Sequence, residues 1–137
     1  MLDQTDIEIL NLLTKNSRMQ WQEIGEIVHL TGQAVKNRIN RMEKLGVIEG
    51  YTLKINSNKV GKEVTAFVTI FMKTTEHAAF QEYIRSNPLI IEANRISGEG
   101  CYMLKVVAAM QTEVIGMLDE ILKYGNYRIN IAIENIK

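Results

Sequence analysis

The first third of the chain carries apolar residues at helical spacing. This spacing predicts three helices, which we expect over residues 2–15, 21–28 and 33–45. Thr31 precedes the third helix, where its hydroxyl can accept a hydrogen bond from a free amide of the first turn. Gly46 follows that helix, where glycine takes up a left-handed, helix-ending conformation with little steric strain. The last two helices, joined by a tight turn, have the form of a helix-turn-helix.

The third helix has two chemically different faces. Val35, Ile39 and Met42 follow an i, i+4, i+7 spacing, and Leu45 extends the same stripe, which predicts that all four pack inward. The opposite side consists of amides and cations, with no carboxylate near its centre. Amide and guanidinium groups read base edges in DNA, whereas lysine and arginine neutralise phosphates. The residues predicted to contact DNA are Gln33, Lys36, Asn37, Arg38, Asn40, Arg41 and Lys44.

An ordinary solvated helix face is the alternative interpretation, and the local charge argues against it. Between residues 31 and 46, four cations accompany a single anion. We expect Asn37 and Asn40 to read bases, and Lys36, Arg41 and Lys44 to contact phosphates. Position 38 lies beside the apolar stripe, so its arginine fits a structural role equally well.

The composition changes from helical to strand-forming after the third helix. A short strand is expected over 47–53, followed by a polar connector that extends to residue 63. Further strands are expected over 64–72, 89–97, 101–108 and 127–136, with helices over 76–86 and 110–123. The order β-α-β-β-α-β is the split ferredoxin-like pattern.

The predicted fold class is therefore α+β, with an N-terminal winged helix-turn-helix and a C-terminal ferredoxin-like domain. We expect the DNA-binding domain over 1–50, with the helix-turn-helix at about 21–45. A linker strand and connector should occupy 51–63, and an assembly and effector domain 64–137.

A four-stranded antiparallel sheet with helices on one side leaves its other face uncovered. These strands are rich in apolar residues, which argues against a fully solvated face. Pairing with a second copy is the simplest cover, so we expect a homodimer or a larger assembly.

Composition and charge narrow the classes of function. The 16 lysines and arginines balance 16 aspartates and glutamates, so any nucleic-acid signal must be local. One cysteine excludes an intramolecular disulfide and favours a reducing compartment. There is no apolar run of the ~20 residues that a membrane span needs, and no signal peptide is evident. We therefore expect a cytoplasmic protein, associated with the nucleoid.

The chain shows no motif for catalysis or metal binding. His29 and His77 lie in different predicted domains, so no zinc-like ligand spacing exists. A nucleophile paired with a base, a P-loop and a dinucleotide glycine motif are also missing. We expect no catalytic residues, no metal and no cofactor.

Taken together, these features resemble the Lrp/AsnC family of bacterial and archaeal transcription regulators, over essentially the whole chain. The residues that carry the resemblance are Leu2, Asp3, Asp6, Ile9, Leu10, Leu13, Arg18, Ile24, Gly25, Leu30, Thr31, Val35, Arg38, Ile39, Met42, Glu43, Gly46, Val47, Ile48, Gly50, Tyr51, Ile96, Ser97, Gly98, Tyr102, Met103 and Leu104. The resemblance implies a winged helix-turn-helix that binds double-stranded DNA. It also implies dimers that assemble into tetramers or octamers, and an amino-acid effector bound between C-terminal domains.

The resemblance places the candidate effector site at Ser97, Gly98, Glu99, Gly100 and Cys101. Family members that respond to amino acids typically have an aspartate just before the aromatic residue at position 102. Here the thiol of Cys101 stands in that place, and a thiol is a poor partner for an ammonium group. Glu99 is the nearest carboxylate in sequence, so the loop serves either an altered effector site or assembly alone.

Two other functions fit the same scaffold. Siroheme decarboxylases resemble this family but use histidines near a tetrapyrrole, and paired histidines are missing from the second domain here. A Soret band in the purified protein would support that alternative. The other is a ligand-sensing assembly module without DNA binding, which a steep fall of DNA affinity with salt would exclude.

Overall fold

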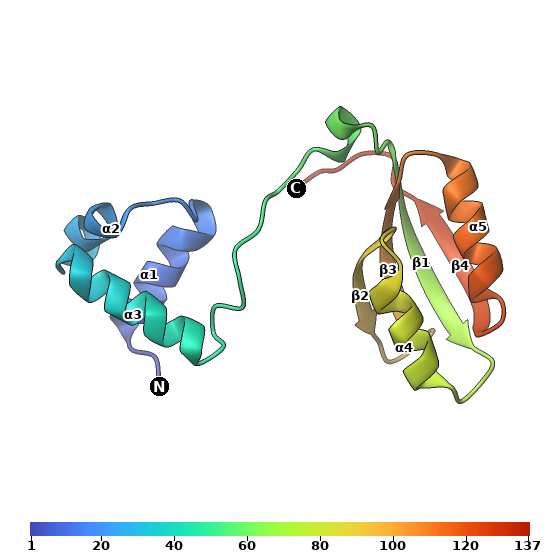
Figure 1. Cartoon of the computed structure of the whole chain (residues 1–137), viewed down its shortest axis with the longest axis horizontal. Coiled ribbons are helices and arrows are strands. Elements are labelled where there is room, and N and C mark those ends of the chain that lie inside the picture. The colour runs from blue at the N-terminus through green and yellow to red at the C-terminus, as the bar shows by residue number, and fades with distance from the viewer. The chain divides into compact units, whose positions relative to one another are not determined.

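The structure, a computed structural model, describes residues 1–137 and divides them into two compact units. Unit 1 spans Met1–Lys54 and contains three helices, whereas unit 2 spans Ile55–Lys137 and contains a sheet with two helices (Figure 1). The predicted domain limits at residues 50 and 64 stay predictions, because compactness alone does not show that a segment folds independently.

The three predicted helices of unit 1 are confirmed within about two residues at each end. They are α1 (Gln4–Lys15), α2 (Trp21–Val28) and α3 (Gly32–Lys44). Their shared core consists of Ile9, Ile24, Val28, Val35, Ile39 and Met42. Full burial of such a side chain stabilises the folded state by roughly 1.5–3 kcal/mol relative to exposure. The core thus contains Val35, Ile39 and Met42 of the predicted inner stripe, which fixes the opposite side of α3 toward solvent. The prediction that Leu45 packs inward is wrong, because Leu45 lies past the end of α3 and is 56% exposed.

Both predicted end signals of α3 are present. The Thr31 side chain accepts a hydrogen bond from the Ala34 amide at 3.1 Å. Gly46 has φ 74°, and its amide donates to the Glu43 carbonyl. The Val47 amide donates to the Met42 carbonyl, which completes a Schellman motif. Local sequence alone therefore sets the length of α3.

A close backbone contact forms the turn between α2 and α3. His29 has a left-handed φ of 61°, and the Leu30 amide donates to the Gly25 carbonyl at 2.9 Å. A Cβ at Gly25 would collide with the Leu30 carbonyl oxygen. Glycine is therefore required here by the turn itself, rather than by a neighbouring helix.

The predicted strand at 47–53 is wrong. Residues 49–56 have no regular secondary structure, and the next element is the 3-10 helix η1 (Ser57–Val60). A strand needs a partner for its backbone, and within unit 1 no extended segment offers one. The Ile48 amide donates to the Met42 carbonyl, and the Tyr51 hydroxyl donates to Glu43 at 3.1 Å. The chain after α3 is thus tied to α3 rather than to a sheet.

Unit 2 has the predicted β-α-β-β-α-β order. Its elements are β1 (Val64–Met72), α4 (His77–Ser86), β2 (Ile90–Arg95), β3 (Tyr102–Ala108), α5 (Gln111–Ile121) and β4 (Gly125–Ile131). The strands form one antiparallel sheet in the order β2-β3-β1-β4, with Ala66 opposite both Val106 and Ile131. Both helices lie on one side of this sheet (Figure 1).

The two faces of the sheet differ in burial. Ala66, Val68 and Ile70 are fully buried and belong to the core with both helices. Side chains alternate along a strand, so the neighbouring positions face the other way. On that open face Phe67 is 39% exposed and Met103 is 43% exposed. Unit 2 therefore leaves one sheet face uncovered, on which these apolar side chains lie beside polar neighbours such as Asn130 and Asn94.

The last strand is shorter than predicted, because β4 ends at Ile131 and not at residue 136. The Ala132 amide still donates to the Thr65 carbonyl at 2.8 Å, but β1 begins at Val64. Beyond that point the chain has no partner strand, because β1 does not extend further, although the apolar alternation of the sequence continues. The alternation predicts which face a residue takes, but not where the partner strand ends.

No helix combines the length and the apolar character needed to cross a bilayer.

We predict that Gly25→Ala destabilises unit 1 by ~1–3 kcal/mol, the usual effect of overpacking, because the new methyl group meets backbone that cannot move freely. Gly50→Ala is the matched control, since a Cβ there meets nothing within 4 Å. The chain's one tryptophan, Trp21, lies in unit 1, so its fluorescence during urea unfolding reports on that unit. Equal unfolding midpoints for the two variants would contradict the proposed role of this turn.

Candidate nucleic-acid interface

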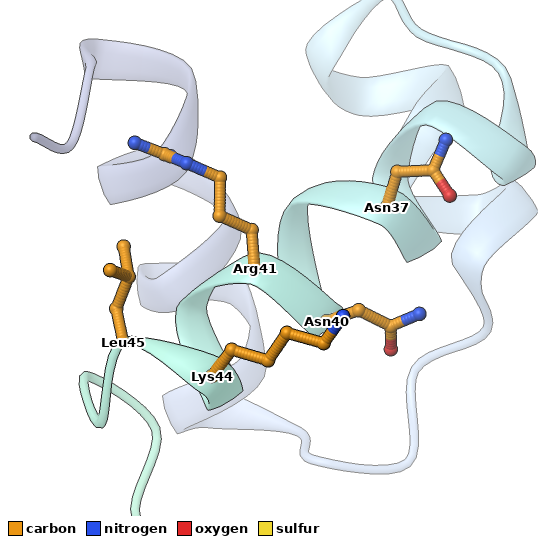
Figure 2. Close-up of a pocket in the computed structure, with 5 residues that line it drawn as sticks. All are labelled: Asn37, Asn40, Arg41, Lys44 and Leu45. Carbon is orange, nitrogen blue, oxygen red and sulfur yellow. The ribbon is translucent and has the colours of Figure 1, made fainter.

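The outer face of α3 has a shallow polar hollow of about 390 Å³. It is lined by Asn37, Asn40, Arg41, Lys44 and Leu45. Figure 2 shows the amides of Asn37 and Asn40 directed away from the helices behind α3, whereas Arg41 extends toward α1. The hollow thus combines the hydrogen-bonding amides of Asn37 and Asn40 with two cations, Arg41 and Lys44.

The Asn37 amide is oriented by a neighbour one turn away. Gln33 Nε2 donates to Asn37 Oδ1 at 3.0 Å, which fixes the side of Asn37 that carries its free N–H groups. Both residues are exposed, as is Asn40. An asparagine amide presents a donor and an acceptor together, the pattern that adenine offers in the major groove.

The two lysines of α3 lie near opposite ends of the helix. Lys44 is exposed in its last turn. Lys36 is half-buried, with its Nζ 5.0 Å from the centroid of the Trp21 ring. This cation–π contact holds the Lys36 ammonium beside the beginning of α2. Two positive groups therefore flank the central amides.

Arg38 is turned toward α1 rather than outward. Its Nη1 donates to both carboxylate oxygens of Asp3, at 2.8 and 2.7 Å, and to Asp6 Oδ1 at 3.0 Å. The hydrogen bond from Arg38, followed by that from the Asp6 amide, lowers the pKa of Asp3 below its ordinary value. The same carboxylates raise the pKa of Arg38, first through the bond to Asp3. The sequence left a structural role and a DNA contact equally open for Arg38, and these contacts give it a structural role.

Arg41 also contacts the beginning of α1, although less tightly. Its Nη1 lies 3.3 Å from Asp6 Oδ2, and its Nη2 donates to the Met1 carbonyl at 2.7 Å. The Arg41 side chain is 46% exposed, whereas that of Asp6 is 1% exposed. A buried carboxylate thus holds a half-exposed guanidinium at the edge of the polar hollow.

Sequence reasoning missed these two carboxylates as partners of α3. Asp3 and Asp6 also form a reciprocal capping box at the first turn of α1. A signal was present, since two acids three positions apart match two arginines three positions apart. Nothing in the sequence shows that these pairs meet across more than thirty positions.

The predicted effector loop is a tight turn between β2 and β3. Gly98 and Gly100 have φ values of 91° and 89°, which glycine adopts without strain. A Cβ at Gly100 would meet the Thr69 side chain at 2.6 Å. The Cys101 amide donates to the Ile70 carbonyl at 2.6 Å, so the loop lies against the end of β1.

The charged groups of this loop lie at its surface. Glu99 Oε2 is 3.6 Å from Arg128 Nη1, and both side chains are well exposed. The Arg128 guanidinium also lies 5.6 Å from the centroid of the Phe71 ring. Ser97 is exposed and Cys101 is half-buried. The structure therefore brings the five predicted loop residues together and adds Arg128, which sequence reasoning did not include.

Comparison with known proteins gives matches over both units. A family profile described as winged helix-turn-helix DNA-binding matches residues 2–49, and one described as Lrp/AsnC ligand binding domain matches residues 65–137. The HTH-type transcriptional regulator LrpB of Bacillus subtilis is 44% identical over 136 residues, which cover 99% of this chain and 91% of LrpB.

Two further proteins of Bacillus subtilis agree with this assignment. The HTH-type transcriptional regulator LrpA is 31% identical over 134 residues, covering 97% of this chain and 98% of LrpA. The structure of LrpC superposes with a TM-score of 0.91 at 31% identity, covering 100% of this chain and 98% of LrpC. The polar outer face of α3 therefore lies in a DNA-binding domain, and the chain belongs to the Lrp/AsnC family of transcription regulators.

Proposed function

We propose that this regulator reads duplex DNA with the outer face of α3 lying in the major groove. One observation carries the proposal, namely that exposed amides and flanking lysines lie on the side of α3 opposite its buried stripe. The helix is wide enough, with its side chains, to fill a major groove but too wide for a minor groove. Sequence-specific contacts would then come from side chains near the middle of the exposed face.

We assign distinct roles to the residues of this face. Asn37 and Asn40 contact base edges, and Gln33 orients Asn37 through their hydrogen bond. Lys36 and Lys44 contact phosphates on either side. The guanidinium groups of Arg38 and Arg41 bind α1, so we leave both out of the direct contacts in the resting protein.

We further propose that the open sheet face of unit 2 pairs with a second copy. Apolar side chains at Phe67 and Met103 lose contact with water when two such faces meet, which favours association. A symmetric dimer presents two copies of α3, and an operator would place its half-sites ~34 Å apart, one helical turn of DNA. Assembly into a tetramer or octamer would then use other surfaces of the same unit. As a DNA-binding regulator, the protein would act on the nucleoid in the cytoplasm.

The loop from Ser97 to Cys101 is our candidate for the effector site. An amino acid carries an ammonium group, and Glu99 is the loop's carboxylate. Its partner in the structure is Arg128, at 3.6 Å, so an ammonium would take the place of that exposed guanidinium. Exposed ion pairs of this kind contribute little, so the exchange has a small energetic barrier.

We predict that Asn37→Ala and Lys44→Ala impair DNA binding in different ways. Loss of the amide should reduce affinity by ~1–3 kcal/mol at one base position, whereas loss of the lysine should weaken binding to all sequences and reduce the salt slope by about 1. Gel-shift titrations on point variants of a selected binding sequence measure both effects.

Asn11→Ala is the control for these titrations, because Asn11 is exposed on α1 and its side chain makes no hydrogen bond. It should bind like the unaltered protein. Identical sequence profiles for the Asn37 and Lys44 variants would contradict the division into base-reading and phosphate-contacting residues.

For the sheet face, we predict that Met103→Glu reduces the molar mass measured by light scattering to that of the monomer, because pairing would bury an unpaired charge. Ile115→Glu is the matched control, since Ile115 is 53% exposed but belongs to α5, on the helix side of the sheet. It should leave the dimer intact. An equal mass for both variants would show that the sheet face is not the dimer interface.

A further inference from the structure

The beginning of α1 binds both arginines of α3, but it binds Arg38 more tightly than Arg41. Arg38 makes three hydrogen bonds of 2.7–3.0 Å through Nη1 and its side chain is 31% exposed. Arg41 has a 3.3 Å contact with Asp6, a bond to a backbone carbonyl, and a side chain that is 46% exposed. Arg38 is thus part of the packing, whereas Arg41 lies at the boundary between the packing and the DNA-facing surface.

The position of Arg41 makes it a potential phosphate contact that the resting structure does not offer. It lines the polar hollow together with Asn40 and Lys44 (Figure 2). If Arg41 turned outward, it would add a third cation to the two lysines of this face. Affinity for DNA of any sequence grows with the number of phosphates that the protein neutralises.

Asp6 opposes that outward turn. Its side chain is 1% exposed, and Asp6 Oδ2 accepts from the Asp3 amide at 3.1 Å as well as from Arg41. Moving Arg41 to a phosphate removes one of the two guanidinium partners of this buried carboxylate. Asp6 keeps Arg38 at 3.0 Å and the Asp3 amide, but the loss of Arg41 is still unfavourable unless something compensates. A non-specific complex, which forms phosphate contacts alone, provides little compensation.

We propose that Asp6 is a specificity-determining residue, which withholds Arg41 from DNA phosphates in non-specific complexes and so limits the affinity of this regulator for non-operator DNA. The inference rests on the proposed function, because it requires α3 to be the helix that contacts DNA. Its consequence is a higher ratio of operator affinity to non-operator affinity than the charge of α3 alone would allow.

Asp3 supplies a matched control for Asp6. Both carboxylates belong to the same capping box and both bind Arg38. Only Asp6 contacts Arg41, and the Asp3 side chain is 57% exposed. Asp6→Asn should therefore release Arg41, whereas Asp3→Asn should leave it in place.

The test measures affinity for random-sequence DNA as a function of salt, with full-length protein. For Asp6→Asn we expect the slope of log affinity against log salt to steepen by about 0.9, and the affinity at 0.1 M salt to rise roughly five- to tenfold. Asp3→Asn should keep the original slope. The double variant Asp6→Asn with Arg41→Ala should return to that slope, which a merely structural effect of Asp6 would not produce.

Arg41→Ala alone decides the question even if Asp6→Asn does not fold, which Trp21 fluorescence would reveal. We expect Arg41→Ala to leave the slope on random DNA unchanged. A slope reduced by about 0.9 would overturn the proposal, as would a folded Asp6→Asn variant whose slope does not change. Lys44→Ala distinguishes failure of the Asp6 proposal from failure of the proposed function. If the salt slope of the Lys44→Ala variant does not change, α3 is not the surface that contacts DNA, and both proposals are wrong.

Discussion

A helix that enters a DNA groove must be held from behind, and α3 is held by an apolar stripe together with one buried carboxylate. Val35 and Met42 are fully buried and Ile39 nearly so. The stripe supplies most of the stabilisation, because burial of apolar area is non-directional and additive to a first approximation. The Asp6 carboxylate fixes the orientation of α3 against α1, because a buried charge is tolerated only where its partners are correctly placed. Every functional statement about α3 depends on this arrangement.

The ion network also changes how the charge of α3 should be counted. Four cations between residues 31 and 46 suggested a strongly basic face, but two of them bind carboxylates of α1. The surface that we propose for DNA has amides at its centre and lysines at its flanks. Such a surface favours recognition of base edges over general attraction to the phosphate backbone. The net charge of zero for the whole chain is consistent with that balance.

The features that could be predicted from sequence are those that local rules determine. The Thr31 cap and the Gly46 end signal involve residues within one turn of each other, and both were correct. The β-α-β-β-α-β order was correct because strand alternation and helical spacing are visible in short windows.

The features that sequence could not provide are contacts between distant segments. The pairing of Asp6 with Arg38 spans 32 positions, and the pairing of Glu99 with Arg128 lies outside any motif. The two errors in strand assignment, at 47–53 and after Ile131, have the same origin, since a strand exists only where a second strand accepts its hydrogen bonds.

The central claim is that the outer face of α3 reads base edges in the major groove. The most direct measurement is methylation interference on a DNA sequence selected by the protein from a random pool. Dimethyl sulfate modifies guanine N7 in the major groove and adenine N3 in the minor groove, the two positions that distinguish the grooves. We predict that methylation of guanine N7 blocks binding within two half-sites one helical turn apart. Interference confined to adenine N3, or none at either position, would contradict this account.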